Sequence, residues 1–185
     1  RLDYHAADGS DYVLNLIDTP GHVDFSYEVS RSLAACEGAL LLADAAQGVQ
    51  AQTLANSYMA IDAGLEVIPA VNKIDLPAAD PDGVASEIVS IFGGSADEVL
   101  RMSAKTGAGV DDLLEKLVSR VPAPEGHPDM PLRALVFDSY FDPFRGVVCY
   151  VRVVDGRLQS GEMLRFMATN DSHIASEIGF LRPKT

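Results

Sequence analysis

Apolar and polar positions change their spacing along the chain, and each spacing predicts a type of element. Residues 2–5 and 12–17 alternate between apolar and polar positions, and Asp8-Gly9 between them favours a tight turn. This pattern predicts a β-hairpin. Three later apolar runs are nearly continuous, as is typical of strands that are buried on both faces. These predicted strands are residues 39–43, 67–71 and 99–102.

Between and around these runs, apolar residues recur at three- and four-residue steps, which predicts helices. The predicted helices are residues 24–36, 50–63, 82–92 and 110–121. Strands that alternate with helices indicate an α/β fold with a mainly parallel sheet and flanking helices. Ligands of such sheets bind beyond the carboxyl ends of the strands. This rule marks four positions: Asp18, Asp44, Asn72 and Ser103.

The composition of the chain changes after residue 121. Residues 122–131 contain four prolines, as is typical of a stiff connection between domains. Beyond them, runs rich in Val, Phe, Tyr and Leu predict strands at 132–140, 146–154 and 162–168. We therefore expect one α/β domain in residues 1–121, a linker in 122–131, and the start of an antiparallel β-barrel domain in 132–185.

Charge and composition exclude some classes of partner. The 185 residues include 48% hydrophobic residues, which is enough for a core, and carry a formal net charge of −13. Such a charge disfavours electrostatic binding of nucleic acid or anionic lipid over a broad surface, so DNA is not an expected partner. No apolar run reaches the ~20 residues that a membrane-spanning helix needs.

The first group of candidate residues follows the apolar segment 12–17. A carboxylate such as Asp18 suits Mg²⁺ that is held through water, with a phosphate nearby. Gly21 has no Cβ, so its N–H can approach a phosphate oxygen, and His22 could then orient an attacking water. Alternatively, Asp18 caps the helix that starts near Asp24, and His22 is a surface residue.

The second group is the Asn-Lys-Ile-Asp sequence of residues 72–75. The Asp75 carboxylate can accept two parallel N–H bonds from guanine, whereas adenine offers no such pair of donors. Asn72 can bond the other edge of the purine or tie two loops together, and Lys73 can lay its stem along the ring. The other interpretation is a strand followed by an ordinary Asn/Asp-rich turn.

The third group, Ser103 to Gly107, could offer backbone N–H groups to the guanine carbonyl, with Lys105 covering the base. Each group is weak evidence alone. Together they follow successive predicted strands in a fixed order, which favours a guanine-nucleotide site.

These motifs resemble those of translational GTPases. The sequence DTPGHVDF (18–25) is typical of translation factors, in which a histidine follows the glycine. Three longer stretches are most similar to the LepA, or elongation factor 4, group: residues 27–56, 72–81 and 137–153. Elongation factor G and the TypA/BipA group share the motifs but fit less well between them, and they remain the alternative within the family.

The resemblance implies a ribosome-dependent GTPase with GTP/GDP and Mg²⁺ as ligands and the 70S ribosome as partner, with proposed roles in back-translocation or rescue of stalled ribosomes. It implies a P-loop-GTPase fold, a monomer and a bacterial cytoplasmic location, with peripheral membrane association left open. His22 would be catalytic and Asp18 would hold Mg²⁺ through water. Nucleotide contacts are expected from Asp18, Thr19, Pro20, Gly21, His22, Asn72, Lys73, Ile74, Asp75, Ser103, Ala104 and Lys105.

One motif of the family is absent from these residues. The phosphate-binding loop G-x-x-x-x-G-K-[ST] does not occur in the sequence. We therefore expect the 185 residues alone to bind GTP poorly and to be inactive, and we expect the sheet to lack a strand and to expose an edge that can aggregate. A non-catalytic module that docks on the ribosome is the alternative function.

Overall fold

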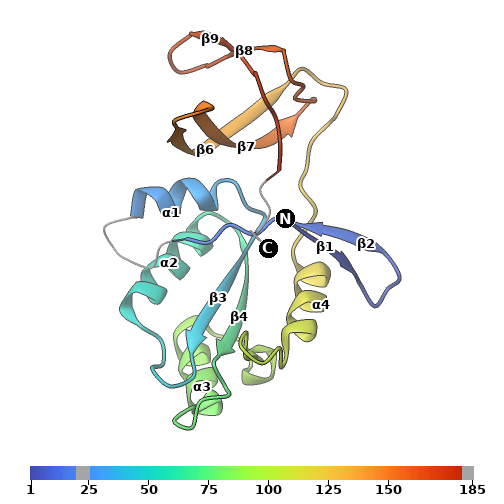
Figure 1. The fold of residues 1–185 in the computed structure, drawn as a ribbon. Helices are drawn as coiled ribbons and strands as arrows, with labels where there is room; N and C mark the ends of the chain where they lie inside the picture. Colours follow the sequence, from blue (N-terminus) through green and yellow to red (C-terminus); the bar gives the residue numbers. More distant parts are fainter. Residues whose placement is uncertain (20–25, 181–185) are drawn as a thin grey trace. The chain divides into compact units, whose positions relative to one another are not determined.

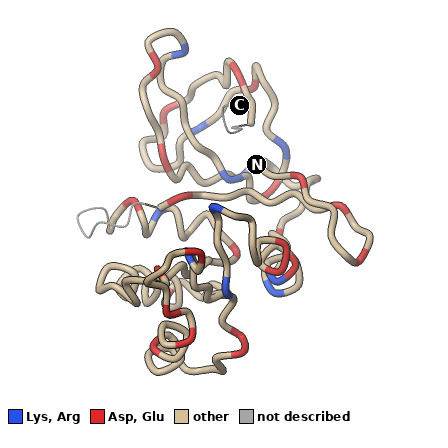
Figure 2. The backbone as a smooth tube through the Cα atoms, turned by 60° about the horizontal axis from the view of Figure 1, so that its bottom comes forward, with Lys and Arg blue, Asp and Glu red and all other residues tan. Residues whose placement is uncertain are grey.

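The computed structural model describes residues 1–19 and 26–180. The chain divides into two compact units, and each is described by itself (Figure 1). The sheet unit comprises Tyr4–Tyr12 and Ile17–Ala123. The C-terminal unit comprises Arg1–Asp3, Val13–Leu16 and Pro124–Thr185. Acidic residues are spread along the backbone of both units, in keeping with the negative net charge (Figure 2).

The sheet unit contains a parallel sheet of three strands in the order β3-β4-β5. These strands are β3 (Gly38–Asp44), β4 (Glu66–Asn72) and β5 (Leu100–Arg101). All three predicted strands are confirmed, although β5 is shorter than predicted. Among the described residues, β3 lies at one edge of this sheet. The expectation that this edge promotes aggregation stays a prediction.

In the described residues, four α-helices flank the sheet, which confirms the α/β prediction (Figure 1). They are α1 (Ser26–Leu33), α2 (Ala51–Asp62), α3 (Pro81–Phe92) and α4 (Val110–Arg120). Helix α3 starts at the predicted place because Asp80 accepts a hydrogen bond from the Gly83 N–H and Pro81 occupies the first turn. The predicted first two residues of the α1 segment lie outside the described residues.

The core of the sheet unit occupies both faces of the sheet. On one face, Val71 of β4 packs with Ala85 and Ile88 of α3. On the other face, Ile68 and Ala70 of β4 pack with Leu113 of α4. The alternation follows from the two-residue period of a strand. Burial of each such aliphatic side chain stabilises the fold by about 1.5–3 kcal/mol.

The predicted N-terminal hairpin forms from β1 (Leu2–His5) and β2 (Asp11–Leu14), which pair with each other. The prediction of a strand through residue 17 is wrong, because β1 has only four residues and pairing ends with it. Asp18 therefore lies four residues beyond the end of β2, and β2 pairs with β1 in a sheet separate from β3-β4-β5. Tyr4 Oη donates a 2.6 Å hydrogen bond to Glu115 of α4, and both residues belong to the sheet unit.

The C-terminal unit consists of antiparallel ladders. The long strands β6 (Arg133–Asp142) and β7 (Gly146–Asp155) pair with two register shifts, and the short strands β8 (Met163–Arg165) and β9 (Ser172–Ile174) pair with each other. β8 is shorter than predicted, and β9 was not predicted because its three exposed residues carry no apolar alternation. The described strands form two separate ladders, so the barrel stays a prediction. Residues 122–131 contain neither helix nor strand.

Candidate guanine-nucleotide site

The carboxyl ends of the parallel strands bring three of the predicted positions to one edge of the sheet. Asp44 and Asn72 are partners in the β3–β4 register, and the Ala45 N–H donates to the Asn72 carbonyl at 2.8 Å. Ser103 follows β5, whose end is joined to β4 by a 2.8 Å bond from the Met102 N–H to the Val71 carbonyl. The sheet thus positions the loops after β4 and β5 side by side.

Asn72 joins these two loops through its side chain. Its Oδ1 accepts the N–H of Lys73 at 2.7 Å and the N–H of Ala104 at 3.0 Å. Of the two roles that the sequence allowed for Asn72, the structure shows the one that ties the loops together. The backbone agrees, because the Ile74 N–H donates to the Met102 carbonyl at 3.3 Å.

Asp75 and Ser103 form a second link between the loops. The Ser103 hydroxyl donates to Asp75 Oδ1 at 2.6 Å, and Ser103 is fully buried whereas Asp75 is exposed. Ser103 Oγ also accepts the Thr106 N–H at 3.2 Å, which sets the direction of the hydroxyl. The hydrogen bond from Ser103 lowers the pKa of the Asp75 carboxyl, with a smaller contribution from the charge of Lys105. Asp75 therefore stays an acceptor at neutral pH.

Lys73 has an unusual backbone and a fixed side chain. Its φ is +66°, a left-handed conformation that few non-glycine residues adopt. Its Nζ donates to Asp44 Oδ2 at 2.6 Å. This bond is the main cause of the lowered pKa of the Asp44 carboxyl, and the Ala46 N–H adds to it. The side chain of Asp44 is 16% exposed and that of Lys73 is 53% exposed.

For the remaining predicted residues, the structure gives exposure or no description. Asp18 and Lys105 are exposed, and Thr19 is half-buried. Pro20, Gly21 and His22 lie outside the described residues, so their predicted roles near a phosphate stay predictions. The structure thus brings together the second and third predicted groups, Asn72 to Asp75 and Ser103 to Lys105.

Asp44 was marked only by its position at a strand end, and its contact with Lys73 was not predicted. The signal in the sequence is a single carboxylate that ends the otherwise apolar strand Gly38–Asp44. That signal indicates a position and does not identify a partner.

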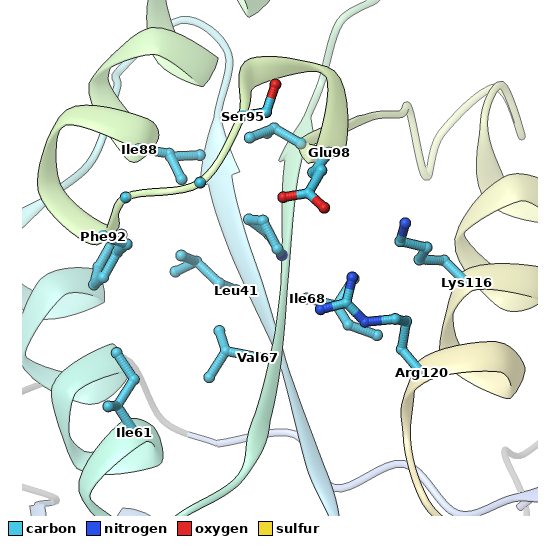
Figure 3. A pocket seen from close by; sticks show the side chains of 14 residues that line it. Leu41, Ile61, Val67, Ile68, Ile88, Phe92, Ser95, Glu98, Lys116 and Arg120 are labelled. Carbon is cyan, nitrogen blue, oxygen red and sulfur yellow. The ribbon is translucent and has the colours of Figure 1, made fainter.

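A cavity of about 280 Å³ lies elsewhere in the sheet unit (Figure 3). It borders residues 67–69 of β4, where β5 does not extend along its neighbour. Lys116 and Arg120 of α4 point toward it, and Arg120 Nε is engaged with Glu66 Oε1 at 2.7 Å. None of the predicted site residues that the structure describes lines this cavity, so it is separate from the loops after β4 and β5.

Comparison with known proteins identifies the family of this chain. The model of the elongation factor Tu GTP binding domain matches residues 2–123. The chain belongs to this family. The match covers both loops of the candidate site, so the loops that Asn72 ties together lie within a GTP-binding domain.

Curated relatives with high identity carry the name elongation factor 4. The chain is 61% identical over 184 residues to elongation factor 4 of Chlorobaculum tepidum, which covers 100% of this chain. It is 60% identical over 183 residues to that of a Synechocystis strain, covering 99% of this chain. It is 58% identical over 184 residues to that of Anoxybacillus flavithermus, covering 100%. The resemblance to the elongation factor 4 group is thus confirmed.

The chain spans about 30% of the length of these relatives. In the described part of the chain, no helix combines the length and the apolar composition that crossing a bilayer requires.

Proposed function

We propose that the protein is a ribosome-dependent GTPase of the elongation factor 4 type, and that Asn72 to Asp75 and Ser103 to Lys105 bind the guanine base. The observation that carries this proposal is the Asn72 side chain, which joins the two loops at the ends of neighbouring strands. This link keeps the loops after β4 and β5 side by side, where together they would form the pocket for the base.

The exposed Asp75 carboxylate suits guanine. A carboxylate has about four acceptor positions, and Ser103 uses one of them at Oδ1. The remaining positions can accept the two N–H groups on one edge of guanine. Adenine would leave Asp75 without these donors, and an unpaired polar group rejects a wrong ligand by a factor of up to ~10⁴–10⁵.

The hydrolytic part of the proposal concerns the segment from Asp18 to His22. Mg²⁺ is held by oxygen ligands and keeps several waters, and the exposed carboxylate of Asp18 and the hydroxyl of neighbouring Thr19 fit such water-mediated binding. Mg²⁺ would neutralise charge on the phosphates. Gly21 would donate its N–H to the γ-phosphate, and His22 would orient the attacking water.

We also propose that residues 132–185 begin a β-barrel that contributes to docking on the 70S ribosome. The support is the pair of ten-residue strands β6 and β7, whose two register shifts are of the kind that curve a sheet. We propose a cytoplasmic monomer that binds GTP and GDP.

The hydrolytic role can be tested with the full-length gene product. GTP turnover is measured with and without 70S ribosomes, for the unchanged protein and for His22→Ala. We expect strong ribosome stimulation that the substitution removes. His127→Ala, an exposed histidine outside the proposed docking residues, is the matched control and should behave like the unchanged protein. Ribosome binding without turnover would instead support the non-catalytic docking module.

The base-binding role has its own test. Asp75→Asn exchanges an acceptor for a donor, so preference should move from GTP toward XTP, since xanthine carries an oxygen where guanine carries an amino group. Asp97→Asn, at an exposed position of the short 3-10 helix Ala96–Glu98, is the control and should keep the preference for GTP. A protein with Asp75→Asn that still prefers GTP would refute the assignment of Asp75.

A further inference from the structure

We infer that Asp44 is a positioning residue of the guanine site, which holds the Lys73 side chain in place for the base without touching the nucleotide itself. This inference rests on the proposed function, because it concerns the same site. It adds to the site a residue from the strand before the Asn-Lys-Ile-Asp sequence.

The first observation is that Lys73 is held at both ends. Its N–H donates to Asn72 Oδ1 at 2.7 Å, within a backbone of φ +66°. Its Nζ donates to Asp44 Oδ2 at 2.6 Å. The four-carbon stem between these two points therefore has a defined course.

The second observation is that Asp44 is itself oriented by its own turn. Asp44 Oδ1 accepts the Ala46 N–H at 2.8 Å, so each carboxylate oxygen has a separate partner. The Asp44 carbonyl accepts the N–H groups of Gln47 at 3.2 Å and Gly48 at 2.9 Å, which closes the turn. Asp44 also stands opposite Asn72 in the strand register. Its position is thus set by the sheet and by the turn, not by Lys73 alone.

The turn is fastened to helix α3 as well. The Asp80 N–H donates to the Ala45 carbonyl at 2.8 Å, and the Val49 N–H donates to Glu87 Oε2 at 3.0 Å. Because the turn after β3 is hydrogen-bonded to β4 and to α3, its backbone holds Asp44 in a fixed position. Asp44 can therefore orient the flexible side chain of Lys73.

The physical effect is preorganisation. Ordering a lysine side chain costs up to about 2 kcal/mol in lost rotamer freedom, and a site that has already ordered it spends less on binding. The ion pair also holds the Lys73 ammonium on Asp44 rather than on Asp75, which lies two residues further along the same loop. The Asp75 carboxylate therefore remains available to accept hydrogen bonds from Ser103 and from the base.

The ion pair could instead serve only to stabilise the fold by joining the ends of β3 and β4. The two roles differ in what they change. A purely structural pair changes the stability of the fold and leaves nucleotide release unchanged, whereas a positioning residue changes nucleotide release through Lys73. A double-mutant cycle between Asp44 and Lys73, followed both by urea unfolding and by nucleotide release, separates them.

The experiment measures release of fluorescent GDP from the full-length protein. Asp44→Asn keeps an acceptor for the Ala46 N–H and removes the charge. We expect release to accelerate about two- to fivefold, the range for a partly exposed ion pair. In a Lys73→Ala background, the same substitution should have no further effect. Asp44→Glu should restore part of the loss, because it keeps the carboxylate.

The matched control is Asp82→Asn, which removes the 2.8 Å ion pair between Asp82 and Arg101 in the same unit. It should leave release unchanged. Release that is insensitive to Asp44→Asn, or that accelerates equally in the Lys73→Ala background, would overturn the inference and leave the guanine site intact. Absence of GDP binding to the unchanged protein would overturn the proposed function, and this inference with it.

Discussion

Strand β4 of the sheet unit and strands β6 and β7 of the C-terminal unit are built from similar residues but are buried very differently. In β4, Ile68, Ala70 and Val71 are at most 1% exposed. In the described part of the C-terminal unit, no residue is buried. Phe141 and Val147 face each other across the ladder and are 74% and 71% exposed.

The difference shows that hydrophobic content predicts a strand but not its burial. β4 is covered because α3 packs on one face and α4 on the other, and each helix comes from the connection that leads into or out of a strand. A ladder of two strands has no such cover and is marginal by itself. The predictions below test how far stability follows this difference, in order of decreasing expected effect.

The largest effect is expected from a substitution that creates a new cavity in the core of the sheet unit. Ile68→Ala removes a side chain that is 1% exposed and should cost about 2–5 kcal/mol. Val147→Ala in β7 removes a side chain that is 71% exposed and should cost far less. Amide hydrogen exchange of β4 and β7 in each variant measures both effects. Equal losses of protection would contradict the contrast between the two units.

Two glycines of similar backbone conformation provide a second comparison. Gly109, before α4, has φ +70°, and a Cβ there would collide with the Arg101 carbonyl oxygen. Gly146, at the start of β7, has φ +79° and open space around it. Gly146→Ala should cost about 1–2 kcal/mol from backbone strain alone, and Gly109→Ala about 1–3 kcal/mol more. Urea unfolding measures the difference, and a smaller effect at Gly109 would contradict the close contact.

Two aspartates that accept backbone hydrogen bonds provide a third comparison. Asp80 caps α3 through the Gly83 N–H at 3.0 Å, so Asp80→Ala should cost about 1 kcal/mol. Asp142 accepts the N–H groups of Phe144 and Arg145 in the turn between β6 and β7.

These bonds, with that of Arg145 the strongest, lower the pKa of the Asp142 carboxyl below its usual 3.8. The stability that Asp142 contributes is therefore present above pH 3.8 and is lost as the pH falls through its lowered pKa. Asp142→Asn should reduce the acid sensitivity of the β6–β7 turn, as followed by the chemical shifts of its amides. Unchanged acid sensitivity would exclude Asp142 as its source.

The smallest effect concerns the hairpin β1–β2 and appears only at high pH. The hydrogen bond to Glu115 raises the pKa of Tyr4 from 10.0 to about 12. Neutral Tyr4 is the donor, so the bond contributes stability below pH 10, and this contribution is lost as the pH rises through about 12. The hydrogen bond to Asp8 also raises the pKa of Tyr12, so the test uses a Tyr12→Phe background. There, ultraviolet titration should show one late tyrosine that is absent when Tyr4→Phe is added and that returns toward its ordinary pKa when Glu115→Gln is added. A late tyrosine that persists in Tyr4→Phe would assign the shift to another residue.

Much of the fold was predictable from local patterns. The continuous apolar runs identified β3, β4 and β5, and the three- and four-residue steps identified the four helices. The exceptions have local causes as well. β2 ends early because its partner β1 is short, and β9 was not predicted because its three exposed residues carry no apolar alternation.

The candidate site was predictable in its chemistry more than in its connections. Asn72, Lys73, Asp75 and Ser103 were marked because amide, carboxylate and hydroxyl groups follow apolar strands. The partner of Lys73 was not predictable, because an ion pair between residues at the ends of neighbouring strands leaves no spacing signal in the sequence.

The sequence alone determined the types of the main elements, the motifs and the resemblance to translational GTPases, because each of these depends on residues that are close together along the chain. Only the tertiary structure decided the links between the loops. Ser103 and Asp75 are 28 positions apart, Lys73 and Asp44 are 29 apart, and Asn72 and Ala104 are 32 apart. Such contacts depend on strand order and register, which place the carboxyl ends of parallel strands at one edge whatever the length of chain between them.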